Sequence, residues 1–201
     1  MSETEPIESE TTPQKSVRER LHLQNANASM WTTLAVLVGA AIYMVTEVTP
    51  MPYLALGLFA LGLAPALAVI ATIGAIRGPI AGFLAGYIGE LTVSAFLTGG
   101  IVTFSLYGIA IGMIGLITGL PSYDFTSGRS LAKLSALSVV GLLFTALITT
   151  AIGLFVEQVA TLVAIGFQLL PMLTIGIPTV ILLTPLFARL WSIVIVRSPW
   201  P

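Results

Sequence analysis

The chain has no cysteine, and its one histidine is His22. Without cysteine there are no disulfides, thiolate nucleophiles or cysteine-ligated metals. A single histidine in a polar terminal segment excludes serine–histidine catalysis and histidine-rich metal sites within the apolar part. Only Lys15 and Lys133 are lysines, and neither lies in the glycine-rich pattern of a phosphate-binding loop. We therefore expect no catalytic activity of its own, no bound cofactor and no direct ATP binding.

Charge is also scarce. Charged residues make up 8 % of the chain and hydrophobic residues 56 %, whereas soluble proteins carry about 25 % charged residues. So few charges cannot cover a soluble domain of this size. The net charge of −1 argues against a nucleic-acid partner. The composition predicts a multi-pass integral protein of the cell membrane, in contact with lipid.

The polar residues are concentrated at the N-terminus. Residues 1–30 are acidic and then basic, and they contain no aromatic residue. Such a segment cannot bury enough apolar surface to fold alone. It is predicted to be a disordered cytoplasmic tail, and residues 31–197 are predicted to form a transmembrane domain.

The apolar region divides into runs long enough to cross a membrane, for which a helix needs about 20 residues. Six predicted spans follow: 31–47, 54–76, 79–97, 101–120, 134–156 and 163–188. With the N-terminus inside, every lysine and arginine falls on the inner side, in agreement with the positive-inside rule. We therefore predict an all-α bundle of six transmembrane helices with both termini in the cytoplasm.

Glycine and proline mark special positions within the predicted spans. Pro65 is expected to kink the second span, and Pro171, Pro178 and Pro185 fall in the last one. The last span is thus either a wall of a binding cavity or simply a kinked structural helix. Small residues at a spacing of four predict close helix packing. These glycines are Gly78, Gly82, Gly86, Gly108, Gly112, Gly115 and Gly119.

Two neighbouring runs carry a family resemblance. Residues 77–90 read RGPIAGFLAGYIGE, and residues 107–120 read YGIAIGMIGLITGL. They resemble the G-P-x-x-G-x-x-x-G-x-x-G-[DE] signature and the glycine-rich fourth helix of S components of energy-coupling-factor (ECF) transporters. The chain length, the six predicted spans and the proline-bearing last helix are similar as well, so the resemblance covers residues 31–197.

The resemblance implies a function. S components capture a micronutrient, usually a vitamin or its precursor, from outside the cell, and they dock onto a transmembrane T subunit driven by two cytoplasmic ATPases. ATP hydrolysis would then be supplied by these partners. In the family a small-residue face on the first helix serves docking, and Ala35 and Gly39 occupy the matching positions. In the family this face carries two alanines four positions apart, and the second of them is a glycine in this chain.

Glu90 is the one ionisable residue well inside a predicted span, where a charge costs about 2.5–3.5 kcal/mol on insertion scales. It is predicted to contact a ligand or carry a proton, or else to hold two helices together as a protonated carboxyl. By the resemblance, the loop after the first helix covers the cavity, which makes Glu47 and Tyr53 candidate contacts; interfacial anchoring is the alternative. The candidate substrate-binding residues are Glu47, Tyr53, Glu90, Thr103, Tyr107, Gln158 and Gln168.

Three functions remain open at this point. A transport subunit predicts an outward-facing cavity near Glu47 and Tyr53, bounded by the last three spans. A structural, non-transporting subunit of a larger membrane complex predicts packed glycine faces without a cavity. A proton or ion carrier using Glu90 predicts a continuous polar path. Because the spans contain no Asn, Asp, Lys, Arg or His, we expect the ligand to be mostly apolar or aromatic.

Overall fold

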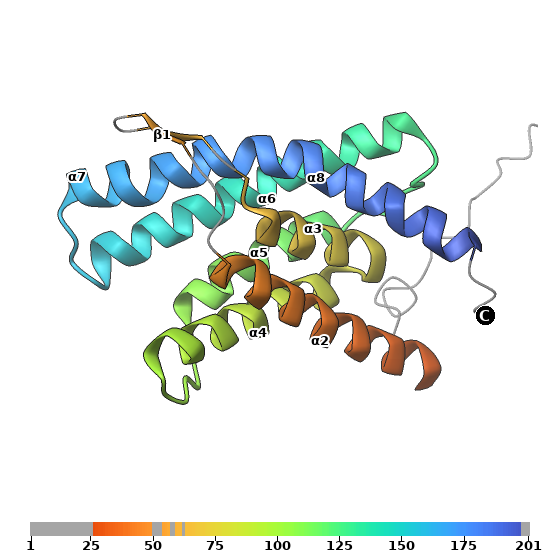
Figure 1. Ribbon diagram of the computed structural model, residues 1–201, viewed down its shortest axis with the longest axis horizontal. Coiled ribbons are helices and arrows are strands. Elements are labelled where there is room, and N and C mark those ends of the chain that lie inside the picture. Colours follow the sequence, from red (N-terminus) through yellow and green to blue (C-terminus); the bar gives the residue numbers. More distant parts are fainter. Residues whose placement is uncertain (1–25, 50–53, 57–58, 62, 198–201) are drawn as a thin grey trace, which may run out of the picture.

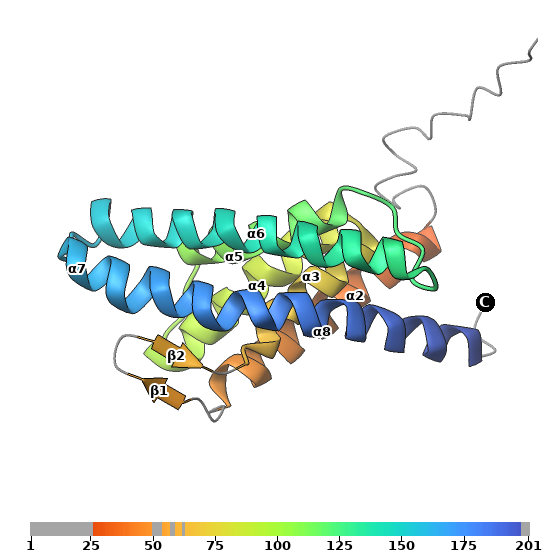
Figure 2. The ribbon, with the colours of Figure 1, turned by 90° about the horizontal axis from the view of Figure 1, so that it is seen from above.

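The computed structural model describes residues 26–49, 54–56, 59–61 and 63–197, and it is a helical bundle. Figure 1 shows it as an elongated bundle in which α6 and α8 run side by side, an arrangement that Figure 2 repeats from above. An antiparallel hairpin of two short strands joins α2 to α3. The elements are α2 (Ala26–Val48), β1 (Leu54–Leu56), β2 (Phe59–Leu61), α3 (Pro65–Arg77), α4 (Pro79–Thr98), α5 (Leu106–Gly119), α6 (Gly128–Phe155), α7 (Thr161–Val163), the π-helical η1 (Ala164–Leu169) and α8 (Leu170–Arg197).

Four helical segments among the described residues are long and apolar enough to cross a membrane. They expose large apolar side chains such as Leu37, Leu147 and Leu182, as helices in contact with lipid do. These features indicate a helical membrane protein. The segments are Ser29–Val48, Pro79–Thr98, Gly128–Phe155 and Thr161–Ile193.

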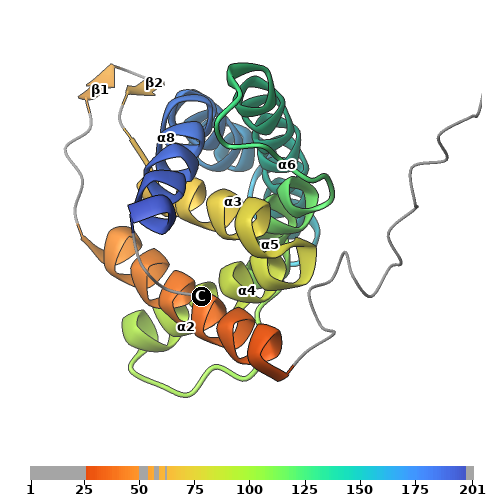
Figure 3. The same ribbon diagram turned by 90° about the vertical axis from the view of Figure 1, so that its right-hand side faces the viewer.

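The remaining two apolar helices are short. α3 has 13 residues and α5 has 14, against the about 20 that a full crossing needs. The end-on view in Figure 3 shows α3 in the middle of the bundle, with α2, α5, α6 and α8 around it. Of the six predicted spans, four therefore have the expected length, and the other two are short helices packed inside the bundle.

The second predicted span, 54–76, is wrong over its first part, and the chain is not purely α-helical there. The strands β1 and β2 occupy residues within 54–61, and α3 begins only at Pro65. Pro65 does not kink a helix; it stands at the first helical position, where its missing N–H has no intrahelical partner to lose. The run of apolar residues before it suits a strand as well as a helix.

The boundaries of α4 and α5 follow local signals. α4 begins at Pro79 and ends before Gly99, which has a φ of 66°, so it matches the predicted span 79–97 closely. α5 begins at Leu106, five residues later than predicted, because Ser105 caps it. The Gly108 N–H donates a hydrogen bond to Ser105 Oγ at 3.0 Å, which satisfies one of the free donors of the first turn.

The outer limits of the bundle also differ from the prediction. α2 begins at Ala26, so the last residues of the predicted tail 1–30 are helical. The predicted disorder of the tail otherwise concerns residues 1–25, which lie outside the described residues. α6 begins at Gly128 rather than at residue 134, and the last helical segment extends to Arg197.

Glycines bring the backbones of α3, α4 and α5 into direct contact. A Cβ atom built on Gly115 would lie 2.4 Å from the carbonyl carbon of Gly82, and one on Gly82 would lie 2.5 Å from the Gly115 oxygen. A Cβ on Gly74 of α3 would lie 2.1 Å from the same oxygen. No side chain fits at these positions. The predicted glycine packing between the third and fourth spans is therefore confirmed, and it extends to α3.

Buried threonines tie the helices together across this interface. The Thr118 hydroxyl donates to the Ala71 carbonyl at 3.0 Å, which links α5 to α3. The Thr145 hydroxyl donates to the Ala110 carbonyl at 2.7 Å, which links α6 to α5. Both threonines are fully buried. Together with the glycine contacts, these bonds hold α3, α4, α5 and α6 in close contact with one another.

Candidate functional site

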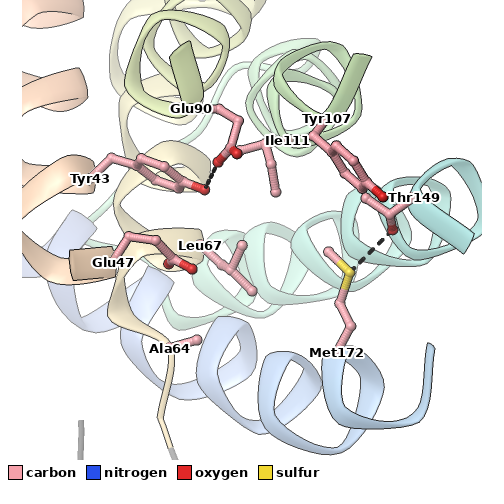
Figure 4. A pocket seen from close by; sticks show the side chains of 9 residues that line it. All are labelled: Tyr43, Glu47, Ala64, Leu67, Glu90, Tyr107, Ile111, Thr149 and Met172. Atoms are coloured by element: carbon pink, nitrogen blue, oxygen red, sulfur yellow. Dashed lines mark hydrogen bonds between the residues drawn. The ribbon is translucent and has the colours of Figure 1, made fainter. Parts of the chain in front are cut away.

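A pocket of about 230 Å³ lies where the helices converge (Figure 4). Its wall draws on α2, α3, α4, α5, α6 and α8, so its shape depends on the whole bundle rather than on one motif. Acidic, phenolic, hydroxyl, apolar and thioether side chains line it. The lining residues are Tyr43, Glu47, Ala64, Leu67, Glu90, Tyr107, Ile111, Thr149 and Met172.

Glu90 is held from two sides. The Tyr43 hydroxyl on α2 donates a hydrogen bond to Glu90 Oε2 at 2.8 Å, and the Ser94 hydroxyl donates to Oε1 at 3.4 Å. Gly89 makes room for the Tyr43 ring, since a Cβ there would lie 2.8 Å from Tyr43 Cδ1. Glu90 therefore links α4 to α2 and also lines the pocket, so its role as a ligand contact stays a prediction.

Glu47 adds a second carboxyl group to the same wall. It follows Tyr43 by four positions on α2, a spacing that places both side chains on one face of a helix. Its side chain is exposed at the rim of the pocket, and Figure 4 shows it beside Leu67. The pocket thus has one carboxyl group fixed in its wall and one at its edge.

The opposite wall is formed by α5, α6 and α8. Tyr107 and Ile111 lie one turn apart on α5 and both face the pocket. The Thr149 hydroxyl of α6 lies 3.5 Å from the sulfur of Met172 on α8 (Figure 4), while its shorter hydrogen bond, at 2.7 Å, goes to the Thr145 carbonyl. This side of the pocket is aromatic, apolar and polarisable, and it offers few strong hydrogen-bonding groups.

Gln168 lies in the π-helical segment η1, and π-helical turns frequently occur at functional sites. A Cβ on Gly153 would lie 2.3 Å from Gln168 Oε1, so the glycine creates the space for the amide. This oxygen is buried and has no hydrogen-bond partner. The Tyr107 side chain is close enough to interact with both Gln168 and Glu157. Gln168 therefore contacts a lining residue without lining the pocket itself.

The other predicted site residues lie elsewhere. Thr103 is exposed on the connection between α4 and α5, and Gln158 is exposed on the connection between α6 and α7, where its φ is 53°. Neither lines the pocket. Tyr53 lies outside the described residues. The predicted residues that the structure brings together are Glu47, Glu90 and Tyr107.

Several residues that line the pocket were not predicted from the sequence, and more helices form its wall than were predicted. Tyr43 carried a usable signal, because it stands one helical turn before Glu47. Leu67, Thr149 and Met172 carried none, since apolar and hydroxyl residues of this kind occur throughout the predicted spans. The pocket is bounded by α2, α3 and α4 as well as by the predicted last three spans.

The predicted docking residues lie on the first helix of the bundle. Gly39 is buried, and a Cβ there would lie 3.0 Å from Cγ1 of Ile73 and 3.3 Å from Cβ of Ala85. Packing of α2 on α3 and α4 accounts for this glycine without a partner subunit. Ala35 is half-buried one turn earlier, and its docking role stays a prediction.

The basic side chains of the described residues lie far from the pocket. Arg77 ends α3, whose first turn lines the pocket, so the two are about 15 Å apart along the helix axis. Lys133 and Thr149 on α6 are separated by about 24 Å in the same way. Arg189 lies about 26 Å along α8 from Met172. The pocket is thus at the acidic end of a bundle whose cations lie at the other end.

No family model matches the chain. It is 34% identical over 95 residues to a UPF0397 protein of Aliivibrio fischeri (strain MJ11), which covers 47% of this chain and 49% of that protein. It is 35% identical over 95 residues to a UPF0397 protein of Aliivibrio salmonicida (strain LFI1238), with the same coverage. A UPF0397 protein of Vibrio atlanticus (strain LGP32) is 33% identical over 95 residues, or 47% of this chain and 50% of that protein. The chain therefore spans about half the length of the curated relatives it matches, and over that half it is similar to UPF0397 proteins.

Proposed function

We propose that the chain is the substrate-specificity subunit of an ECF-type, ATP-driven uptake transporter and that it binds a micronutrient, a vitamin or precursor, from outside the cell. The observation that carries this proposal is the pocket at the acidic end of the bundle. A wall contributed by six helices, with two carboxyl groups, two phenols and apolar side chains, has the mixed lining of a small-molecule site. The family resemblance supplies the transport class.

The proposal includes a six-crossing topology with both termini in the cytoplasm. The described cations end α3, begin α6 and lie toward the end of α8, and cytoplasmic loops are enriched in such residues. The pocket then opens toward the outside, where a nutrient arrives. In this topology α3 and α5, each too short to cross alone, span the membrane together with the connections that flank them, and both pack against neighbouring helices of the bundle.

The topology is testable because the natural chain has no cysteine. Ser122→Cys places a thiol on the exposed connection before α6, and Ala160→Cys places one on the exposed connection after it. A membrane-impermeant maleimide is expected to label Ala160→Cys in intact cells and Ser122→Cys only after permeabilisation. Labelling in the reverse order would contradict the proposed orientation, and labelling of both in intact cells would contradict a crossing by α6.

The partner subunits are tested by purification from the native membrane in mild detergent. We expect an affinity-tagged chain to recover a larger transmembrane subunit and a pair of cytoplasmic ATPases, identified by protein mass spectrometry, because the chain has no phosphate-binding loop of its own. Recovery of an unrelated membrane complex without ATPases would support the structural-subunit alternative and overturn the transport proposal.

The two alternatives receive less support from the geometry. A purely structural subunit has no need of a pocket that gathers two carboxyl groups. A proton or ion carrier using Glu90 needs a polar path through the bundle, whereas the core next to the pocket contains apolar residues such as Ile70, Ile114 and Leu142, all fully buried. A solute-binding subunit needs only the pocket and a partner that opens it.

A further inference from the structure

The charge of the pocket is unbalanced. Glu90 and Glu47 line it, and among the described residues no lysine, arginine or histidine does. Both carboxylate oxygens of Glu90 accept hydrogen bonds, one from Tyr43 and one from Ser94. Hydrogen-bond donors to a carboxylate favour its ionised form, and here they make one bond of 2.8 Å and one longer bond of 3.4 Å. A carboxyl group in partly apolar surroundings either pairs with an opposite charge or takes up a proton, and the described basic side chains that could pair with it lie at the other end of the bundle.

The remaining lining suits a cation that carries apolar groups. Tyr43 and Tyr107 contribute aromatic rings on different sides of the pocket, as Figure 4 shows, and Met172 contributes a polarisable sulfur. Aromatic rings attract ammonium groups through their negative faces, an effect used in the recognition of quaternary ammonium ligands. Leu67 and Ile111 supply apolar surface for the rest of such a molecule.

We propose that the solute is a small organic cation, either an amine or a positively charged heteroaromatic ring, whose charge pairs with Glu90 and Glu47 and whose apolar part packs between Tyr107, Leu67 and Ile111. The inference rests on the proposed function and narrows its substrate class. The volume of about 230 Å³ lies below the range of about 300–1,000 Å³ for sites of drug-sized ligands. It therefore suits a single ring with short substituents.

The charge selectivity can be measured with three probes of one shape. Benzylammonium, benzyl alcohol and benzoate share a phenyl ring and differ in the charge of the attached group. Each is titrated by calorimetry into the full chain purified in detergent and washed until no co-purified solute remains. We expect benzylammonium to bind at least about tenfold more tightly than benzyl alcohol, a difference in Kd that one partly buried ion pair supplies, and benzoate to bind most weakly.

Substitutions assign this preference to the pocket. Glu90→Gln is expected to weaken benzylammonium binding about tenfold and to weaken benzyl alcohol binding much less, because the amide keeps a hydrogen-bond acceptor but no charge. Asp124→Asn is the matched control, because it removes one negative charge from an exposed position on the connection between α5 and α6. It is expected to change neither affinity. Glu47→Gln provides a second carboxyl variant at the exposed rim in case Glu90→Gln fails to fold, and it is expected to act in the same direction.

The outcomes separate this inference from the proposed function. Equal binding of benzyl alcohol or benzoate would overturn the cation assignment, and so would an equal loss for charged and neutral probes in Glu90→Gln. Absence of binding by all three probes would overturn it as well. None of these results affects the recovery of the ATPases and the transmembrane subunit. That recovery tests the transport proposal independently.

Discussion

Gly115→Ala is expected to destabilise the bundle by about 3 kcal/mol or more, the upper end of the range for overpacked cores. The added methyl group would lie 2.4–2.7 Å from backbone atoms of Gly82, and a backbone cannot move aside as a flexible side chain can. α4 and α5 would have to separate along their whole contact. Thermal unfolding of the purified protein in detergent measures the effect.

The matched control for Gly115→Ala is Gly128→Ala. A Cβ on Gly128, the first residue of α6, meets no atom within 4 Å, so this substitution is expected to keep the unfolding temperature or raise it slightly. Gly115→Ala with the unfolding temperature of the wild type would show that α4 and α5 do not touch at Gly82, and the packing described above would be incorrect.

Leu67→Trp is expected to abolish solute binding while the bundle still folds. Leu67 is 7 % exposed and lines the pocket from the first turn of α3. An indole in its place would extend into the cavity of about 230 Å³ and leave too little room for a solute. The measurement is mass spectrometry of the small molecules that remain bound to protein purified from the native membrane. The wild type is expected to retain a solute and the variant is not.

Two further variants make the test specific. Leu143→Trp introduces the same side chain at a 40 % exposed position on α6, and it is expected to retain the solute. Thr149→Phe fills the pocket from α6, so it is expected to repeat the effect of Leu67→Trp if that variant unfolds. Full retention of the solute by both pocket-filling variants would place the binding site elsewhere.

The sequence predicted the fold best where local signals and apolar length agree. Pro79 and Gly99 delimit α4, and the predicted span matched it closely. The region before Pro65 has no such signal, because an uninterrupted apolar run forms a buried strand or a helix with equal ease. The hairpin and the short length of α3 are therefore properties of the tertiary structure, in which β2 packs against α8.

The site was predictable only in its ionisable part. A carboxyl group within an apolar helix is costly, so Glu90 is conspicuous in the sequence, and Glu47 and Tyr107 stand at span ends near it. Thr149 and Met172 reach the pocket because α6 and α8 pack side by side, a contact between distant parts of the chain. Thr103 and Gln158 were chosen for their polarity near the same ends, but both side chains are exposed.

The most direct test of the solute-binding proposal is a density map of the protein purified from its native membrane without added ligand. We expect density for a compact organic molecule between Glu90, Glu47 and Tyr107, and we expect this density to disappear in Leu67→Trp. A pocket occupied only by a lipid chain, or closed by direct contact of these side chains in the wild type, would contradict the proposal.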